Sequence, residues 1–302
     1  MTPCLTFLEK VKLFFRKYPS AILCGVDGNN IILRKICLDN SLMVARLGSV
    51  ELSCISHFII HRVEGKLKPY PQHVSDAMSN NAGFFPVNDE YLDRFCQMFI
   101  NHIKNVDIMG VWYNDYEDLT IRDYCPRADL VELSCLESFR FEEPWSSKLE
   151  GQVVLVIHPF VESIRKQYNE KRNLLFNNPN VLPLFELKTI KAVQSIANTR
   201  VDFQTWFDAY EFMCREIEKI DFDIAIIGAG AYGLPLASFV KQLGKKAVHL
   251  GGATQILFGI KGQRWEREYA NSIAKLFNEH WVRPNSSETP ENSKNVEGAC
   301  YW

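Results

Sequence analysis

The residues best suited to do chemistry lie in the stretch ARLGSVEL, where Arg46, Ser49 and Glu51 surround Gly48. A guanidinium group such as that of Arg46 can neutralise phosphate oxygens, and a carboxylate such as that of Glu51 can take a proton from a hydroxyl group. An apolar run from Leu42 to Ala45 precedes this turn and predicts a strand, and a helical pattern begins near Glu51. We therefore expect a polar turn between a strand and a helix.

A second basic stretch, GGATQILFGIKGQRW, places Lys261 and Arg264 after Gly251 and Gly252. Ammonium and guanidinium groups in this position could bind phosphate oxygens through charged hydrogen bonds. A solvated surface loop would account for the two charges equally well, but the surrounding glycines favour a ligand site.

Candidates for acid/base work are a carboxylate or a histidine at a cleft. The choices are Glu51, His158 in VIHPFVES, Asp115 in WYNDYED, and His249. His158 ends an apolar strand pattern, so it could act as a base, bind substrate, or simply be tied to the backbone. The sequence does not rank these four residues.

The stretch DIAIIGAGAYGLPLA matches the G-x-G-x-x-G pattern of dinucleotide-binding enzymes with Gly228, Gly230 and Gly233. Such enzymes also need an acidic residue at the end of the next strand, whereas KKAVHL leads to His249 and two glycines. The missing carboxylate disfavours NAD or FAD. Free N–H groups of a helix that begins near Tyr232 would still attract an anion, although the glycines could also serve close packing alone.

Composition and charge narrow the classes of protein. The chain has 302 residues, 47% of them hydrophobic, and a formal charge of −2, which argues against a general nucleic-acid surface. Nine scattered cysteines show no metal-binding spacing and indicate reduced thiols. Without a signal peptide or an apolar membrane span, we expect a cytoplasmic protein. An amphipathic segment at the start of the chain leaves peripheral membrane contact open.

Apolar strands that alternate with helices predict an α/β, Rossmann-like layered fold with a mostly parallel sheet flanked by helices. Ligands bind such sheets at the carboxyl ends of the strands, which we expect to carry Gly48, Trp112, His158, Gly228 and Gly251. We predict a single domain over residues 1–283, with an N-terminal helix and hairpin over residues 1–40. Residues 284–302 form a polar tail whose aromatic end docks on its own or a neighbouring protomer.

Two of these motifs together resemble the GT-D-type bacterial glycosyltransferases. ARLGSVEL resembles that family's R-F-G-D-G-E-L signature, with Arg46, Gly48 and Glu51 matching and Ser49 at the aspartate position. FDIAIIGAGAYGLPLASFVKQLGKKAVHLGG resembles the family's late strand, glycine turn, helix and strand. The resemblance extends in order from about Leu42 to Gly252.

The resemblance implies a glycosyltransferase that moves a sugar from a nucleotide-diphosphate donor, expected to be a UDP-sugar, to a glycan or glycoconjugate acceptor in surface polysaccharide or glycoprotein assembly. In the family an aspartate-x-glutamate pair holds a divalent cation, so Ser49 and Glu51 would be the metal ligands for Mn²⁺ or Mg²⁺, with Ser49 a weak replacement. The donor site would comprise Arg46, Gly48, Ser49, Gly228, Gly230, Tyr232, Gly233, His249, Gly251, Gly252, Lys261 and Arg264.

Two other functions stay open. The first is a non-catalytic nucleotide- or glycan-binding homologue that has lost its metal site, and the second is a dinucleotide-dependent oxidoreductase. A homo-oligomer is compatible with the sequence.

Overall fold

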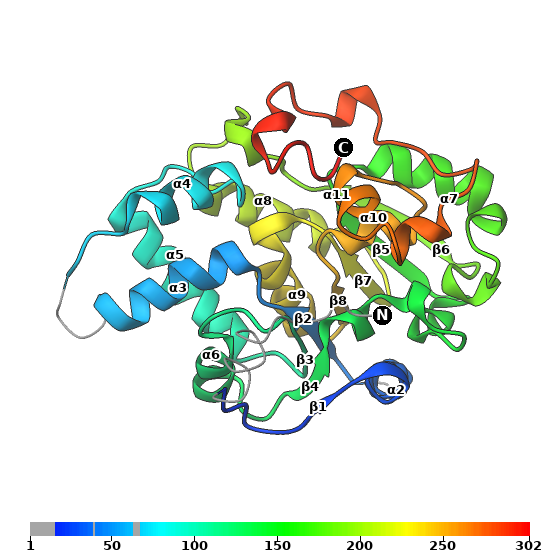
Figure 1. Cartoon of the computed structure of the whole chain (residues 1–302), viewed down its shortest axis with the longest axis horizontal. Helices are drawn as coiled ribbons and strands as arrows, with labels where there is room; N and C mark the ends of the chain where they lie inside the picture. Colours follow the sequence, from blue (N-terminus) through cyan, green and yellow to red (C-terminus); the bar gives the residue numbers. More distant parts are fainter. Residues whose placement is uncertain (1–15, 39, 63–66) are drawn as a thin grey trace.

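The computed structural model describes residues 16–38, 40–62 and 67–302. One sheet of eight strands, all paired in parallel, runs through it in the order β1-β4-β3-β2-β8-β7-β5-β6 (Figure 1). The strands are β1 Ile22–Leu23, β2 Leu42–Arg46, β3 Ile108–Val111, β4 Asp129–Glu132, β5 Val153–His158, β6 Glu186–Lys191, β7 Ile224–Ile227 and β8 Lys246–His249. This confirms the predicted α/β layered fold.

Helices cover both faces of the sheet, because its central strands are apolar on both sides. The helices are α2 Gly25–Ile36, α3 Ser49–His61, α4 Gln72–Asn80, α5 Asp89–Ile103, α6 Glu117–Tyr124, α7 Val161–Leu175, α8 Trp206–Glu218, α9 Gly233–Gln242, α10 Ala253–Leu257 and α11 Gln263–Arg267. Helices α3, α4 and α5 gather at one end of the molecule and α7 lies at the other (Figure 1). Within the described residues, no helix has the length and apolar character needed to cross a membrane.

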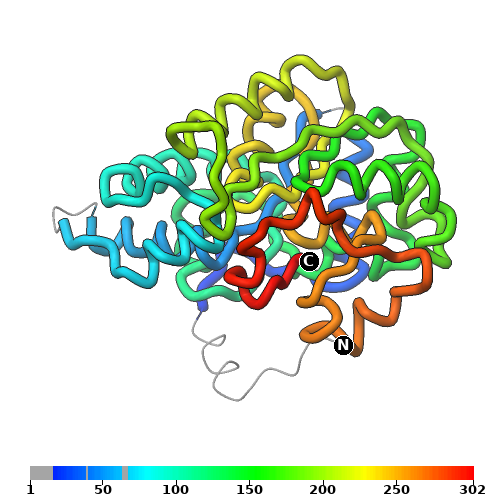
Figure 2. Tube along the Cα trace, turned by 90° about the horizontal axis from the view of Figure 1, so that it is seen from above, coloured from blue at the N-terminus to red at the C-terminus, as the bar shows by residue number. Residues whose placement is uncertain are grey.

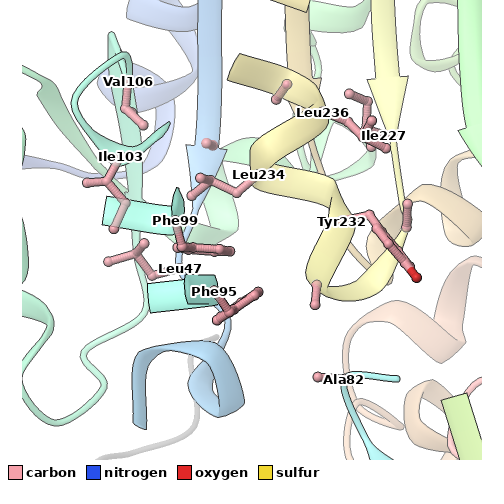
Figure 3. Close-up of a cluster of buried hydrophobic side chains, with 14 of the residues drawn as sticks. Leu47, Ala82, Phe95, Phe99, Ile103, Val106, Ile227, Tyr232, Leu234 and Leu236 are labelled. Atoms are coloured by element: carbon pink, nitrogen blue, oxygen red, sulfur yellow. The ribbon is translucent and has the colours of Figure 1, made fainter. Parts of the chain in front are cut away.

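Two buried clusters fill the space between the sheet and its two helical layers. One cluster joins the strands to α5, α8 and α9. Figure 3 shows part of it, with Phe95 and Phe99 of α5 on one side and Leu234 and Leu236 of α9 on the other. The other cluster packs α2, α7 and α10 against the opposite face. The sheet is therefore held rigidly from both sides, which places its strand ends in fixed positions.

The strands and helices expected around the polar and glycine turns are present. The run from Leu42 to Ala45 is strand β2, and the helix expected near Glu51 is α3, which begins at Ser49. The glycine stretch forms β7, a short 3₁₀ turn, α9 and β8 in the expected order.

Residues 20–36 do not form the expected strands and turns. Strand β1 is two residues long and pairs in parallel with β4, so there is no hairpin among the described residues of this region. The rest is helix α2, whose buried residues recur at helical spacing: Gly28, Asn29, Ile32 and Ile36. A Cβ on Gly28 would lie 2.4 Å from Sγ of Cys135, so this glycine allows close packing and does not mark a turn. The helix expected at the start of the chain falls on residues 1–15, outside the described residues.

The C-terminal segment packs back on the body of the protein. The indole N–H of Trp302 donates to the carbonyl of Glu288 at 3.2 Å, and the backbone N–H of Gln263 donates to the carbonyl of Trp302. Near the other end of the tail, the amide of Asn80 donates to the carbonyl of Asn295 at 2.9 Å. In Figures 1 and 2 this red segment lies beside the orange segment that contains α10 and α11. The tail therefore bridges the α4 end of the molecule and α11.

Candidate active site

A cavity of about 370 Å³ opens at the carboxyl ends of five neighbouring strands, β3, β2, β8, β7 and β5. The five residues that the sequence places at these ends all line it: Gly48, Trp112, His158, Gly228 and Gly251. Ligands of open α/β sheets bind in this position because the loops that follow the strands form a crevice there. The parallel topology thus collects motifs that lie up to 200 residues apart in the chain into one site.

Arg46, the last residue of β2, carries a positive charge that forms no ion pair with an acidic group in the described ranges 16–38, 40–62 and 67–302. Its guanidinium lies 4.5 Å from the centre of the Trp112 ring, and a Cβ on Gly251 would lie 3.2 Å from its Nη1. Its Nε atom is buried, and among the described residues the side chain makes no hydrogen bond or ion pair. A buried guanidinium donor without a partner is costly, so a ligand that supplies an acceptor would bind here favourably.

Glu51 lies in the first turn of α3 and faces the same cavity. Its Oε2 occupies the space beside Gly48, because a Cβ on that glycine would come within 1.9 Å of it. Burial raises the pKa of the Glu51 carboxyl, and the charge of Arg46 opposes this rise. A carboxyl whose pKa lies above its usual value is suited to exchange protons near neutral pH.

The corner formed by Ser49 and Glu51 does not suit a divalent cation. Within residues 16–38, 40–62 and 67–302, no group of three His, Cys, Asp or Glu side chains could hold a metal ion. Hard cations such as Mg²⁺ and Mn²⁺ prefer several ionised oxygen ligands, whereas this corner offers one carboxyl, one hydroxyl and the positive charge of Arg46. The residue types fit an anion better than a cation.

The two cavity histidines are neutral in the folded protein. Burial lowers the pKa of His158 to about 3, and burial together with the charge of Arg46 lowers the pKa of His249 to about 3. Nδ1 of His158 accepts a hydrogen bond from the backbone N–H of Phe160 at 3.0 Å, which leaves Nε2 as the protonated nitrogen. Both imidazoles are therefore weak bases, and His158 is better suited to donate a hydrogen bond.

The glycine turn after β7 contributes backbone to the cavity and a ring to the core. Gly228, Gly230 and Tyr232 line the cavity, and the Tyr232 ring stacks on Trp206 with centroids 4.5 Å apart. In Figure 3, Tyr232 lies between Ile227 of β7 and Ala82. A Cβ on Gly228 would meet the carbonyl of Gly251 at 2.7 Å, so only glycine fits this close approach of two strand ends.

Gly233 does not line the cavity, contrary to the expectation from the G-x-G-x-x-G pattern. A Cβ at this position would lie 2.1 Å from Cε1 of His249. Gly233 therefore allows the first turn of α9 to pack against the His249 ring. At this position the glycine serves close packing, which was the alternative to anion binding.

Arg264 also lines the cavity but is already paired. Its guanidinium donates to the carboxylate of Glu297 and lies 5.0 Å from the Tyr301 ring, both from the C-terminal tail. The tail residues Val296, Glu297, Tyr301 and Trp302 form part of the cavity wall. Lys261, the other predicted phosphate contact, does not line the cavity.

Asp115 is not part of this cavity either. It follows β3 in a loop that turns away, and its exposed carboxylate forms an ion pair with Arg16 at 3.1 Å. It lines a second hollow of about 430 Å³. The remaining predicted contacts do line the first cavity: Ser49, Glu51, Gly230, His249 and Gly252.

Several cavity residues were not predicted from the sequence. Gln255 is buried and its side-chain amide N–H donates to the carbonyl of Tyr301 at 3.0 Å, which leaves Oε1 without a partner among the described residues. Asn81 and Ala82 follow α4, and Gln194, Ser195 and Ile196 follow β6. The aromatic end of the tail and the asparagines and aromatic rings of SNNAGFFPVND, which contains Asn81 and Ala82, are sequence signals for such a site, whereas nothing in the sequence marked residues 194–196.

No protein-family model matches the sequence, and no curated protein matches it. Two solved structures are similar to the chain. One is a selenomethionine-substituted structure of domain of unknown function 1792, with 11% identity, a TM-score of 0.46, and coverage of 94% of this chain and 96% of that chain. The other, reported as the highly conserved domain of unknown function 1792 with a distinct glycosyltransferase fold, has 10% identity, a TM-score of 0.47, and coverage of 93% and 96%.

Proposed function

We propose that this protein is a glycosyltransferase that uses a nucleotide-diphosphate sugar, with a UDP-sugar as the expected donor. The observation that carries the proposal is the unpaired guanidinium of Arg46 between the Gly48 and Gly251 turns, with the Glu51 carboxyl beside it. The motif resemblance of ARLGSVEL supports the same assignment. The acceptor would be a glycan or glycoconjugate in surface polysaccharide or glycoprotein assembly.

In this proposal the diphosphate lies against Arg46. A guanidinium group offers a planar fork of N–H donors that matches phosphate oxygens. Glycines at 48 and 251 let the ligand approach the backbone, because a side chain at either position would occupy the space beside Arg46. His158 would add a neutral hydrogen-bond donor to the diphosphate, and Oε1 of Gln255 would accept a hydrogen bond from a hydroxyl group of the donor.

The transfer breaks the bond between the anomeric carbon and the diphosphate oxygen, which leaves with the electron pair. The oxygen of the acceptor hydroxyl group forms the new bond to the anomeric carbon, and its proton passes to the Glu51 carboxylate. We choose Glu51 as the base because the pKa values of His158 and His249 are about 3 and Asp115 lies outside the cavity. Arg46 stabilises the charge that develops on the leaving diphosphate.

We further propose that the reaction needs no divalent cation. The cation of the GT-D family would offset the diphosphate charge, and in this chain Arg46 takes that part. Ser49 cannot replace an aspartate ligand because its hydroxyl is neutral at neutral pH.

Calorimetric titration with UDP and UDP-sugars, with and without Mn²⁺, tests the donor site. We expect binding that Mn²⁺ leaves unchanged, and release of UDP when donor and acceptor are both present. A protein that binds no nucleotide would overturn the donor site. Binding without donor consumption would instead identify the non-catalytic homologue, and a strict requirement for Mn²⁺ would overturn the metal-free reaction.

A further inference from the structure

A second hollow, of about 430 Å³, lies beside the donor cavity along α3. Ser49 lines both, so the two spaces meet at the first turn of this helix. Ser53 and His57 continue from Ser49 at intervals of four residues, which puts the three side chains on one face of α3 over roughly 12 Å. A polar stripe therefore runs from the donor cavity into the hollow.

Another part of the lining is a loop in an unusual backbone conformation. Tyr113 and Tyr116, which follow β3, have φ angles of 60° and 66°, in the left-handed region that residues other than glycine rarely adopt. Strain of this kind persists where the surrounding structure imposes it, and it is concentrated at functional sites. Arg16 holds this loop by donating to the carbonyl of Asn114 at 2.7 Å and pairing with Asp115.

One polar group of the loop lacks a partner. The side-chain Nδ2 of Asn114, which lines the hollow, is buried and makes no hydrogen bond with any described residue. An unpaired buried amide donor is unfavourable, and an acceptor on a ligand would satisfy it.

The chemistry of the lining favours a neutral, hydroxyl-rich ligand. Hydroxyl, imidazole and amide groups both donate and accept hydrogen bonds, as sugar hydroxyls require. The described lining contains no Lys or Arg, and its carboxylate, Asp115, is paired with Arg16, so the lining presents no fixed net positive charge to attract an anionic ligand. Ile60 and Tyr116 are 38% and 48% exposed and provide apolar surface for the C–H faces of a sugar ring.

From this geometry we infer that the hollow is the acceptor subsite and that it binds a neutral glycan. The acceptor lies along Ser53 and His57, with its reacting hydroxyl group directed past Ser49 towards Glu51. This inference rests on the proposed function, because an acceptor is needed only if the first cavity holds a donor.

The test measures glycan binding and nucleotide binding separately on the full chain. Labelled protein, saturated with UDP, is applied to a printed array of neutral oligosaccharides, and UDP affinity is measured by calorimetry. Ser53→Trp fills the hollow from an exposed helix position, so we expect the fold to be retained. Ser286→Trp is the matched control, because Ser286 is exposed and lines neither cavity.

We expect the wild type and Ser286→Trp to bind the same neutral glycans. Ser53→Trp should lose that binding at least tenfold, with UDP affinity within twofold of the wild type. His57→Phe, which keeps the ring and removes its hydrogen bonds, should weaken glycan binding in the same direction. No bound glycan for the wild type, or equal binding by Ser53→Trp, would overturn the acceptor subsite. A protein that fails to bind UDP would instead overturn the proposed function.

Discussion

Two arginines line one cavity, each beside a different aromatic ring, and define what we call its Arg46 end and its Arg264 end; among the described residues only Arg264 has a charged partner. Arg264 donates to Glu297 of the C-terminal tail and lies over Tyr301. Arg46 lies over Trp112 and, among the described residues, has no acidic group paired with it. The charge available to a ligand is therefore at the Arg46 end.

The two arginines therefore have different roles, one structural and one available to a ligand, although the residue type is the same. A paired arginine holds its own structure together, here the tail against α11. Arg46 forms no ion pair with a described residue, and the Glu51 carboxyl beside it has a raised pKa, so more of the Arg46 charge remains available to an anion. The Arg46 end also contains Glu51, so binding and proton transfer are expected there together.

The largest effect is expected for Glu51→Gln, which removes the base at the Arg46 end. The transfer rate should fall by about 100- to 10,000-fold, the usual contribution of general base catalysis, while UDP still binds. Steady-state assays measure this loss. Glu268→Gln, at the Arg264 end of the cavity, is the matched control and should lose far less. An equal loss in both variants would remove the distinction between the two ends.

Glu51→Gln should also change how the stability of the fold depends on pH. The pKa of Glu51 is raised in the folded protein, so the unfolded chain loses its proton first as the pH rises above the usual range of a carboxyl. Glu51 therefore contributes a loss of stability with rising pH through this window, and Glu51→Gln lacks that contribution. Thermal melts should show a Tm advantage of the variant that grows with pH; a constant difference would contradict the buried carboxyl.

Substitution of the arginines themselves compares the two ends directly. Arg46→Gln should weaken UDP binding by about 10- to 100-fold, because hydrogen bonds to a charged group contribute about 1.5–3 kcal/mol. Arg264→Gln should weaken it much less, since its guanidinium is already paired. Calorimetry with UDP measures both constants. The reverse order would place the diphosphate at the Arg264 end.

Adjacent glycines allow a finer comparison. Gly251→Ala adds a Cβ 3.2 Å from Nη1 of Arg46 at a backbone φ of +62°, so it should lower UDP affinity several-fold and cost about 1–2 kcal/mol of stability. Gly252→Ala instead meets Tyr301, beside Arg264, at 2.9 Å. We expect that variant to lower the Tm and leave UDP affinity within about twofold, as overpacking away from a ligand does.

The smallest effect is expected for Glu297→Gln. This change leaves Arg264 without its carboxylate partner, so UDP should bind about two- to threefold more tightly through the added positive charge. Ser293, which precedes Glu297 in the tail, offers a neutral control, Ser293→Ala, which leaves the ion pair in place. Unchanged affinity in Glu297→Gln would mean that the diphosphate never reaches Arg264.

Prediction from the sequence succeeded where the signal was local. The apolar runs before Gly48, His158 and Gly228 identified buried strands, and the residues just after them line the cavity. It failed for α2, where a hairpin was expected and Gly28 packs a helix against Cys135, and for Gly233, which accommodates His249. In both cases a glycine serves a long-range contact that the neighbouring sequence does not reveal.

The sequence by itself determined the strands β2, β3, β5, β7 and β8, and hence that Arg46, Trp112, His158 and Gly228 lie at strand ends, because hydrophobic periodicity is a local property of the chain. Only the tertiary structure decided the strand order that brings those ends together. It also decided that Glu297 neutralises Arg264 and that Asp115 lies in a separate hollow. These outcomes depend on crossover topology and on packing between distant segments, which no local pattern specifies.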